Sequence, residues 1–185
     1  MEKINILFGF EESQFQRSVE KRLGDLGYDA EIVCKYSKKA IADYLHNHTE
    51  VKHVVLKEMI GRNSYQDQEL AALMDERDLN IVIVLSEKHR GTSYMETLYA
   101  SGIIGAIFQG NRDSTATAGL VANLLHYKRK RADARKYYGI MEKTGLHLDS
   151  LSADHFNDLM AGLNDISYGS SRQSRFLSFP SKTCS

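Results

Sequence analysis

The sequence predicts an α/β protein built on a five-stranded parallel sheet with helices on both faces. Five short apolar runs alternate with five segments in which apolar residues recur at helical spacing. Strands that alternate with helices pair in parallel through right-handed crossovers, which place helices on both faces of the sheet. The chain has 185 residues, 42% hydrophobic and 26% charged, which is enough for one such domain and an extension.

In the first half of the chain, three apolar runs are expected strands and two periodic segments are expected helices. In order, they are Ile4–Phe10 (strand), Glu12–Leu26 (helix), Asp29–Cys34 (strand), 38 to about 46 (helix) and His53–Met59 (strand). Gly27 suits the residue just after a helix, where glycine favours the left-handed conformation. Ser37 is a good N-cap for the second helix.

The second half continues the alternation with two helices, two strands and a last long helix. In order, they are Tyr65–Arg77 (helix), Leu79–Ser86 (strand), Thr92–Ser101 (helix), Ile103–Gln109 (strand) and a helix capped by Asp113 that runs toward Lys136. The doubly wound strand order of flavodoxin-like folds fits this pattern. Because ligands of such sheets bind beyond the carboxyl ends of the strands, we expect functional residues near 9–12, 57–61, 86–88 and 109–111.

The most informative motif is residues 102–110, which read GIIGAIFQG. A glycine closes a helix, an apolar strand follows, and the strand ends in Gln109 and Gly110. In layout, element order and spacing, residues 3–127 resemble the receiver domain of response regulators, in which this strand ends in Lys-Pro. The resemblance implies a strand-end pocket in which an acidic pair holds Mg²⁺, an aspartate accepts a phosphoryl group, and a hydroxyl and a lysine contact that group.

The corresponding positions depart from the receiver pattern at almost every point. In chain order they are Glu11, Glu12, Lys57, Glu58, Ser86 and Gln109. The acidic pair is displaced and also suits a helix start, where carboxylates complement the dipole. The acceptor position falls on Lys57 or Glu58, with Glu58 the better match, although both also suit a solvated strand end. Ala106 stands where receivers carry an aromatic switch residue. The resemblance therefore implies a degenerate, or pseudo-receiver, domain with no resident metal or cofactor.

The predicted function is a non-catalytic interaction or regulatory module that works by dimerisation or partner binding without phosphorylation. The expected partner surface includes Tyr94, Tyr99, Arg129, Lys130 and Arg131. The receiver-like modules of pilus-assembly and partition-type ATPases look similar, so an ATPase acting in trans is one expected partner.

Two alternatives stay open. One is an atypical response regulator that binds Mg²⁺ and takes up phosphate through Glu12, Glu58 and Ser86. The other is a nucleic-acid-binding regulator that uses the basic stretch 128–136. This stretch also suits the solvated end of a helix, and the formal net charge of zero gives nucleic-acid binding little support.

The remaining features set the expected domain organisation and exclude several classes of protein. Residues 1–127 are the expected receiver-like domain, 128–166 a basic linker with an amphipathic helical extension, and 167–185 a disordered tail. Two cysteines make no disulfide framework and no metal spacing, which favours a reducing cytoplasmic location. We find no signal peptide, no apolar run long enough to span a membrane, and no nucleotide-binding, zinc-protease or hydrolase motif.

Overall fold

The computed structural model describes residues 1–60, 63–76, 79–90, 92–94, 98, 103, 105–110 and 113–126. The elements in these residues are β1 (Glu2–Phe8), α1 (Ser13–Asp25), β2 (Tyr28–Cys34), α2 (Lys38–Asn47), β3 (His53–Lys57), β4 (Met59–Ile60), β5 (Asn63–Ser64), α3 (Asp67–Glu76), β6 (Asn80–Leu85), a 3₁₀ turn (Glu87–His89), β7 (Gly105–Phe108) and α5 (Ser114–His126). Five strands form one parallel sheet in the order β2-β1-β3-β6-β7. This is the doubly wound, flavodoxin-like order, so the predicted fold class is confirmed.

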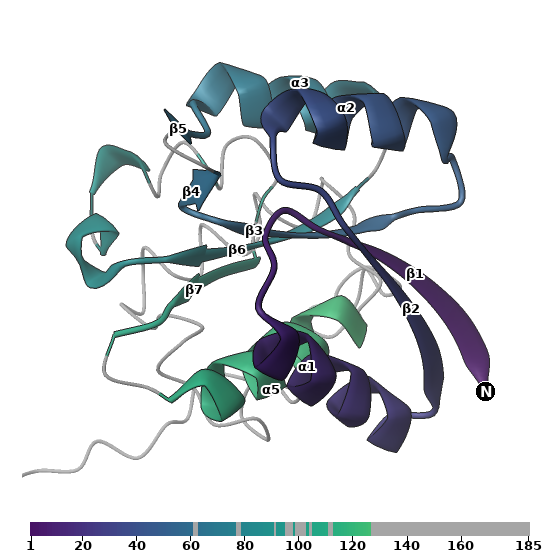
Figure 1. Ribbon diagram of the computed structural model, residues 1–185. Coiled ribbons are helices and arrows are strands. Elements are labelled where there is room, and N and C mark those ends of the chain that lie inside the picture. Colours follow the sequence, from purple (N-terminus) through teal and green to yellow (C-terminus); the bar gives the residue numbers. More distant parts are fainter. Residues whose placement is uncertain are drawn as a thin grey trace, which may run out of the picture.

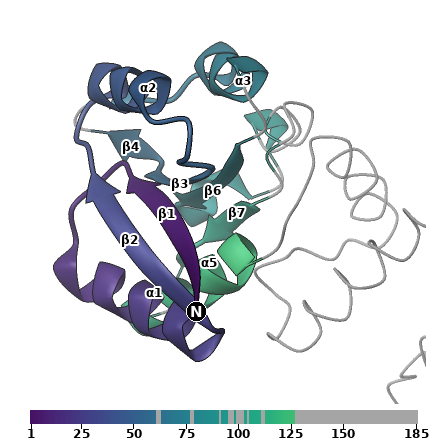
Figure 2. The same cartoon turned by 90° about the vertical axis from the view of Figure 1, so that its right-hand side faces the viewer.

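The sheet lies between two layers of helices (Figures 1 and 2). Helices α1 and α5 cover one face, and α2 and α3 cover the other. The central strands β3 and β6 are apolar along nearly their whole length because both of their faces are covered. Their buried side chains join those of the helices in one core. None of the helices in the described ranges is long and apolar enough to cross a membrane.

The expected helix ends are confirmed at three places. Ser37 caps α2, since its hydroxyl accepts a hydrogen bond from the backbone N–H of Ala40 at 3.1 Å. Asp113 caps α5 in the same way, through a 2.7 Å bond from the N–H of Ala116. Gly27 follows α1 with a φ of 91°, a left-handed conformation in which glycine carries no steric cost.

Several elements differ in their bounds from the sequence prediction. The first strand was expected at Ile4–Phe10 but is Glu2–Phe8. The third strand was expected to reach Met59 but ends at Lys57, and the chain then turns into a small antiparallel hairpin of β4 and β5. The helix expected from Tyr65 begins at Asp67; the Tyr65 ring is buried in the core and lies beneath the ammonium group of Lys38. Most of the expected helix 92–101, the helical extension 128–166 and the tail 167–185 lie outside the described residues.

Candidate functional site

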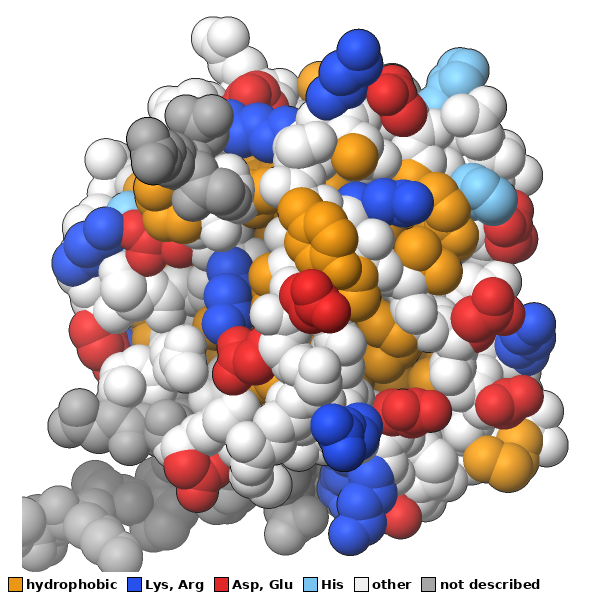
Figure 3. All heavy atoms as spheres, in the orientation of Figure 1, with side chains coloured by type: hydrophobic (Ala, Val, Ile, Leu, Met, Phe, Trp, Pro, Cys, Tyr) orange, Lys and Arg blue, Asp and Glu red, His pale blue; other side chains and the backbone are white. Residues whose placement is uncertain are grey.

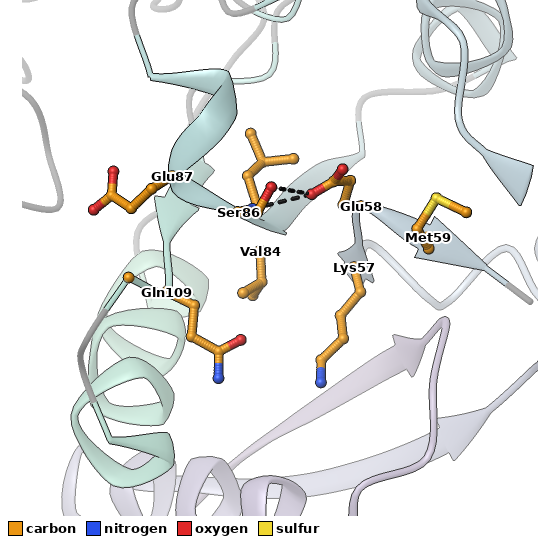
Figure 4. A pocket seen from close by; sticks show the side chains of 9 residues that line it. Lys57, Glu58, Met59, Val84, Ser86, Glu87 and Gln109 are labelled. Atoms are coloured by element: carbon orange, nitrogen blue, oxygen red, sulfur yellow. Dashed lines mark hydrogen bonds between the residues drawn. The ribbon is translucent and has the colours of Figure 1, made fainter.

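An open cleft of about 550 Å³ lies at the carboxyl ends of β3, β6 and β7. Its lining includes four of the predicted pocket residues: Lys57, Glu58, Ser86 and Gln109. Each stands at or directly after the end of its strand, so the parallel register of the sheet brings them to one edge. In Figure 4, Lys57 and Glu58 leave the end of β3 in opposite directions, while Lys57 and Gln109 extend to the same side.

Glu58 is held by groups from the end of β6 and the turn that follows it. Its Oε2 accepts hydrogen bonds from the hydroxyl of Ser86 at 2.6 Å and from the backbone N–H of Ser86 at 3.1 Å. Its Oε1 lies 2.5 Å from Nζ of Lys88 and 2.9 Å from Nε2 of His89. The Glu58 side chain is only 14% exposed. A buried carboxylate is costly unless it is paired and hydrogen-bonded, and both conditions are met here.

These contacts determine the charge state of Glu58. Burial acts to raise the pKa of its carboxyl, but the contacts with Lys88, Ser86 and His89 outweigh burial and lower the pKa to about 2. Glu58 is therefore a fixed anion at neutral pH. The Ser86 hydroxyl, which in the receiver pattern would contact a phosphoryl group, is already donated to this carboxylate.

Lys57 turns to the other side of the strand end and meets the loop after β1. Its Nζ donates to Oε2 of Glu12 at 2.5 Å and lies 4.7 Å from the centre of the Phe10 ring. Both members of the ion pair are about one-third exposed. The other carboxylate oxygen of Glu12 accepts from the hydroxyl of Ser114 at 3.4 Å. Of the two candidates for the acceptor position, Lys57 is thus the one whose side chain faces an early carboxylate.

Gln109 continues the ladder at the end of β7, where its backbone N–H donates to the carbonyl of Leu85 at 3.0 Å. Its side chain offers an amide but no charge. Gly110 follows with a φ of 50°, and an added Cβ there would lie 2.7 Å from a carboxylate oxygen of Glu87. Glycine at this position therefore serves a left-handed turn that closes tightly on the loop after β6.

The two predicted members of the acidic pair do not converge on a shared site. Glu11 is exposed and lies beside Tyr36, whose pKa is raised by slight burial and by the negative charge of Glu11. Glu12 is engaged by Lys57 instead. Within the part of the chain that the structure describes, no group of three or more acidic, histidine or cysteine side chains is placed to hold a metal ion. The two carboxylates that line the cleft are already paired with cations, Glu58 with Lys88 and Glu87 with Arg90.

The predicted partner surface is described at one position only. Tyr94, expected to be exposed, is half-buried: its ring packs on His89 at 4.9 Å between centroids, and its hydroxyl donates to the carbonyl of Tyr65 at 3.4 Å. Tyr99, Arg129, Lys130 and Arg131 lie outside the described residues, as does the rest of the basic stretch 128–136.

Sequence reasoning missed the roles of Lys88 and His89. Residues near 88 were expected at the functional edge because they follow a strand, but nothing assigned these two side chains to Glu58. A signal was available in the sequence. Two basic residues lie within three positions of Ser86, the predicted strand end, and Glu58 stands at the end of the neighbouring strand. His89 belongs to no metal-binding motif that could have singled it out.

Comparisons with known proteins find distant similarity to solved structures. No family model matches the sequence, and no curated protein matches it. Similar solved structures include the signal receiver domain of NarL from Mycobacterium tuberculosis (16% identity, 69% of this chain and 100% of that one, TM-score 0.47). They also include a response regulator receiver domain protein from Clostridium thermocellum (12%, 68% and 94%, 0.41). A third is the N-terminal domain of a response regulator/sensory box/GGDEF protein from Carboxydothermus hydrogenoformans (15%, 76% and 99%, 0.45). Similarity at this level is too weak to assign function, so the flavodoxin-like α/β fold rests on the strand order and layers described above.

Proposed function

We propose that this protein is a non-catalytic, receiver-like regulatory module that associates with itself or with another protein without being phosphorylated. The observation that carries the proposal is the hydrogen bond from the Ser86 hydroxyl to the Glu58 carboxylate at 2.6 Å. In the receiver pattern, this hydroxyl forms a hydrogen bond with the transferred phosphoryl group. Here it donates its hydrogen bond to a permanent carboxylate of the same chain, so the loop after β6 is organised without a covalent modification.

The other charges at the strand ends support the same conclusion. Phosphoryl transfer depends on groups that neutralise developing negative charge. Lys57 already forms an ion pair with Glu12, and the side chain of Gln109 carries no charge. Glu12 and Glu58, the carboxylates on which the atypical-regulator alternative depends, are each paired with a lysine. We therefore favour a permanently organised binding module over a phosphorylated one.

The proposal is tested by incubating the full chain with Mg²⁺ and acetyl phosphate, a small-molecule phosphodonor, and measuring intact mass and light scattering together. We expect no gain of a phosphoryl group and no change in association. An ordinary receiver domain labelled in parallel shows that the donor is active. A phosphoryl adduct that changes association would overturn the proposal in favour of the atypical regulator.

A partner must also exist. We expect either a self-associated species or a protein recovered on the immobilised chain from native lysate, in equal yield with and without the phosphodonor. The matched comparison is the Ser86→Ala variant, which lacks the hydrogen bond from the Ser86 hydroxyl to Glu58. Its yield of dimer or recovered protein is measured beside that of the parent chain. A chain that stays monomeric and recovers no protein would contradict the proposal.

A further inference from the structure

In the part of the chain that the structure describes, the strand β2 forms an open edge of the sheet. It is seven residues long, and among these described residues it pairs with β1 alone. Figure 2 shows it as the outermost strand, with α1 and α2 to its two sides. An open edge is a template for pairing with another strand, and proteins commonly block it with proline, lysine or a very short strand. β2 contains neither proline nor lysine.

The backbone groups that point outward from this edge can be identified. The N–H of Lys35 donates to the carbonyl of Phe8 in β1 at 2.9 Å, and the carbonyl of Gly27 accepts from the N–H of Glu2 at 3.2 Å. Because successive residues of a strand alternate in direction, the odd-numbered residues face β1 and the even-numbered residues face outward. The residues whose backbone groups point outward are Tyr28, Ala30, Ile32 and Cys34. Their uncharged side chains lie on one face of the sheet, and those of Asp29, Glu31 and Val33 lie on the other.

On the face of the sheet that α1 covers, the β2 side chains beside the edge are apolar. Ala30, Ile32 and Cys34 are half-buried and pack against the core, while Tyr36, just beyond the strand, is 56% exposed. An open groove of about 380 Å³ runs between α1 and this strand. Ala30 and Ile32 line it on the β2 side, and the polar side chains of Ser13, Gln16, Arg17 and Glu20 line it on the α1 side. In Figure 3, hydrophobic side chains form a band over this side of the molecule, with charged side chains around it.

We propose that β2 pairs in antiparallel orientation with β2 of a second copy, about a two-fold axis at Ile32, so that the two sheets join into one. This inference rests on the proposed function and names the surface of its self-association. A two-fold interface requires a self-complementary patch, and a strand edge meets that requirement because its outward N–H and C=O groups can pair with those of an identical antiparallel strand.

Charge complementarity selects the register. The midpoint of β2 is Glu31, and an axis there would place the Glu31 carboxylates of both copies directly opposite each other, which is destabilising. An axis at Ile32 places Glu31 opposite Val33 of the second copy. It also places Asp29 opposite Lys35 of the second copy, twice by symmetry.

The ion pairs of the single chain agree with this register. Glu31 is already paired with Lys3 at 2.8 Å. No ion pair of Asp29 or Lys35 is found within the described part of the chain; Lys35 lies instead over the Tyr44 ring at 4.7 Å. On the other face of the strand, Ile32 meets Ile32, and each Ala30 meets a Cys34. Opposite charges thus meet at both ends of one face, where Glu31 lies opposite Val33 nearer the centre, and apolar side chains meet at the centre of the other face.

Engineered disulfides test the axis directly. In a chain with Cys34 and Cys184 replaced by serine, Ile32→Cys places two thiols on the axis. Directly opposed residues of a hydrogen-bonded antiparallel pair have Cα atoms about 5.5 Å apart, within the roughly 4.4–6.8 Å that a disulfide spans. Ala30→Cys in the same background is the matched control, because its two copies lie four residues apart, about 13 Å along the strand.

We expect Ile32→Cys to form a disulfide-linked dimer under mild oxidation and Ala30→Cys to stay unlinked. Asp29→Lys and Lys35→Asp should each weaken the dimer about tenfold by light scattering over a dilution series, and the double variant should restore it. A dimer that forms no disulfide through Ile32→Cys and is unaffected by the charge substitutions would overturn the edge proposal and leave the proposed function standing. A chain that stays monomeric would also overturn the edge proposal. If this monomeric chain also recovers no partner protein from lysate, the proposed function is overturned as well.

Discussion

Replacing Glu58 by glutamine removes the one charge on which the arrangement at the end of β6 depends. The amide keeps the size of the side chain and one acceptor oxygen, so the Ser86 hydroxyl retains a partner. Lys88 and His89 lose the carboxylate that lies 2.5 and 2.9 Å from them. The variant therefore tests charge and leaves packing almost unchanged.

The magnitude follows from the pKa. Each unit of pKa corresponds to about 1.4 kcal/mol, so a fall from the ordinary 4.5 to about 2 amounts to about 3–4 kcal/mol of folding stability. Lys88 is 68% exposed and its charge is screened, which reduces the expected loss to about 2–3 kcal/mol at pH 7. Because the folded-state pKa is lowered, this stabilisation is complete above about pH 4.5 and disappears as the pH falls toward 2.

Urea denaturation at a series of pH values from 7 to 2.5 checks this prediction. The gap between the parent and Glu58→Gln should be constant above about pH 5 and close steadily below it. Glu31→Gln is the matched control: its side chain is 59% exposed, and loss of its pair with Lys3 should leave the stability almost unchanged. Equal stability of the parent and Glu58→Gln at pH 7 would mean that the charge of Glu58 does not stabilise the fold.

Three further predictions concern the neighbouring elements. Ser86→Ala should cost about 1–2 kcal/mol and raise the pKa of Glu58 toward its ordinary value, seen as a shift of acid unfolding to higher pH. A double-mutant cycle of Lys57→Met and Glu12→Gln should give a coupling of only about 0.5–1 kcal/mol, since both side chains are one-third exposed. Gly105→Ala should cost more than about 2 kcal/mol in thermal or urea denaturation, because its Cβ would lie 2.7 Å from a backbone oxygen of β6.

Each of these has a result that would contradict it. Acid unfolding of Ser86→Ala at the parent pH would mean that the hydroxyl does not hold Glu58. A coupling above about 2 kcal/mol would mean that Lys57 and Glu12 are more desolvated than their exposure indicates. For Gly105, the matched control is Gly24→Ala, whose added Cβ meets no atom within 4 Å and should leave stability unchanged or higher. Similar effects at the two glycines would contradict the steric argument.

The fold could be predicted from the sequence because its signals are local. Alternating apolar runs and periodic segments fix the order of strands and helices, and Ser37, Asp113 and Gly27 mark helix ends by their own chemistry. The end of β3 was harder to predict. Met59 and Ile60 continue the apolar pattern, yet they pair with Asn63 and Ser64 in a separate hairpin. Such a pairing depends on tertiary contacts that periodicity does not encode.

The sequence predicted where the site lies but not which of its side chains form ion pairs and hydrogen bonds with one another. Strand ends placed Lys57, Glu58, Ser86 and Gln109 at one edge because parallel strands share it. Which side of the sheet each side chain would face depended on a one-residue register that the sequence left open. The partners of Glu58 come from a turn whose conformation no local motif specifies. The mutual engagement of the charged groups, on which the proposed function rests, was therefore visible only in the structure.

We propose that the charged groups at the strand-end cleft are already paired within the chain and that the cleft takes up no phosphoryl group. A direct test is an amide chemical-shift titration of the isotopically labelled full chain with Mg²⁺ and beryllofluoride, a phosphoryl mimic. We predict that the amide signals of Lys57, Glu58, Ser86 and Gln109 stay unchanged. Saturable shifts of these signals, beyond those caused by matched ionic strength, would contradict the account and show that the cleft is a working receiver pocket.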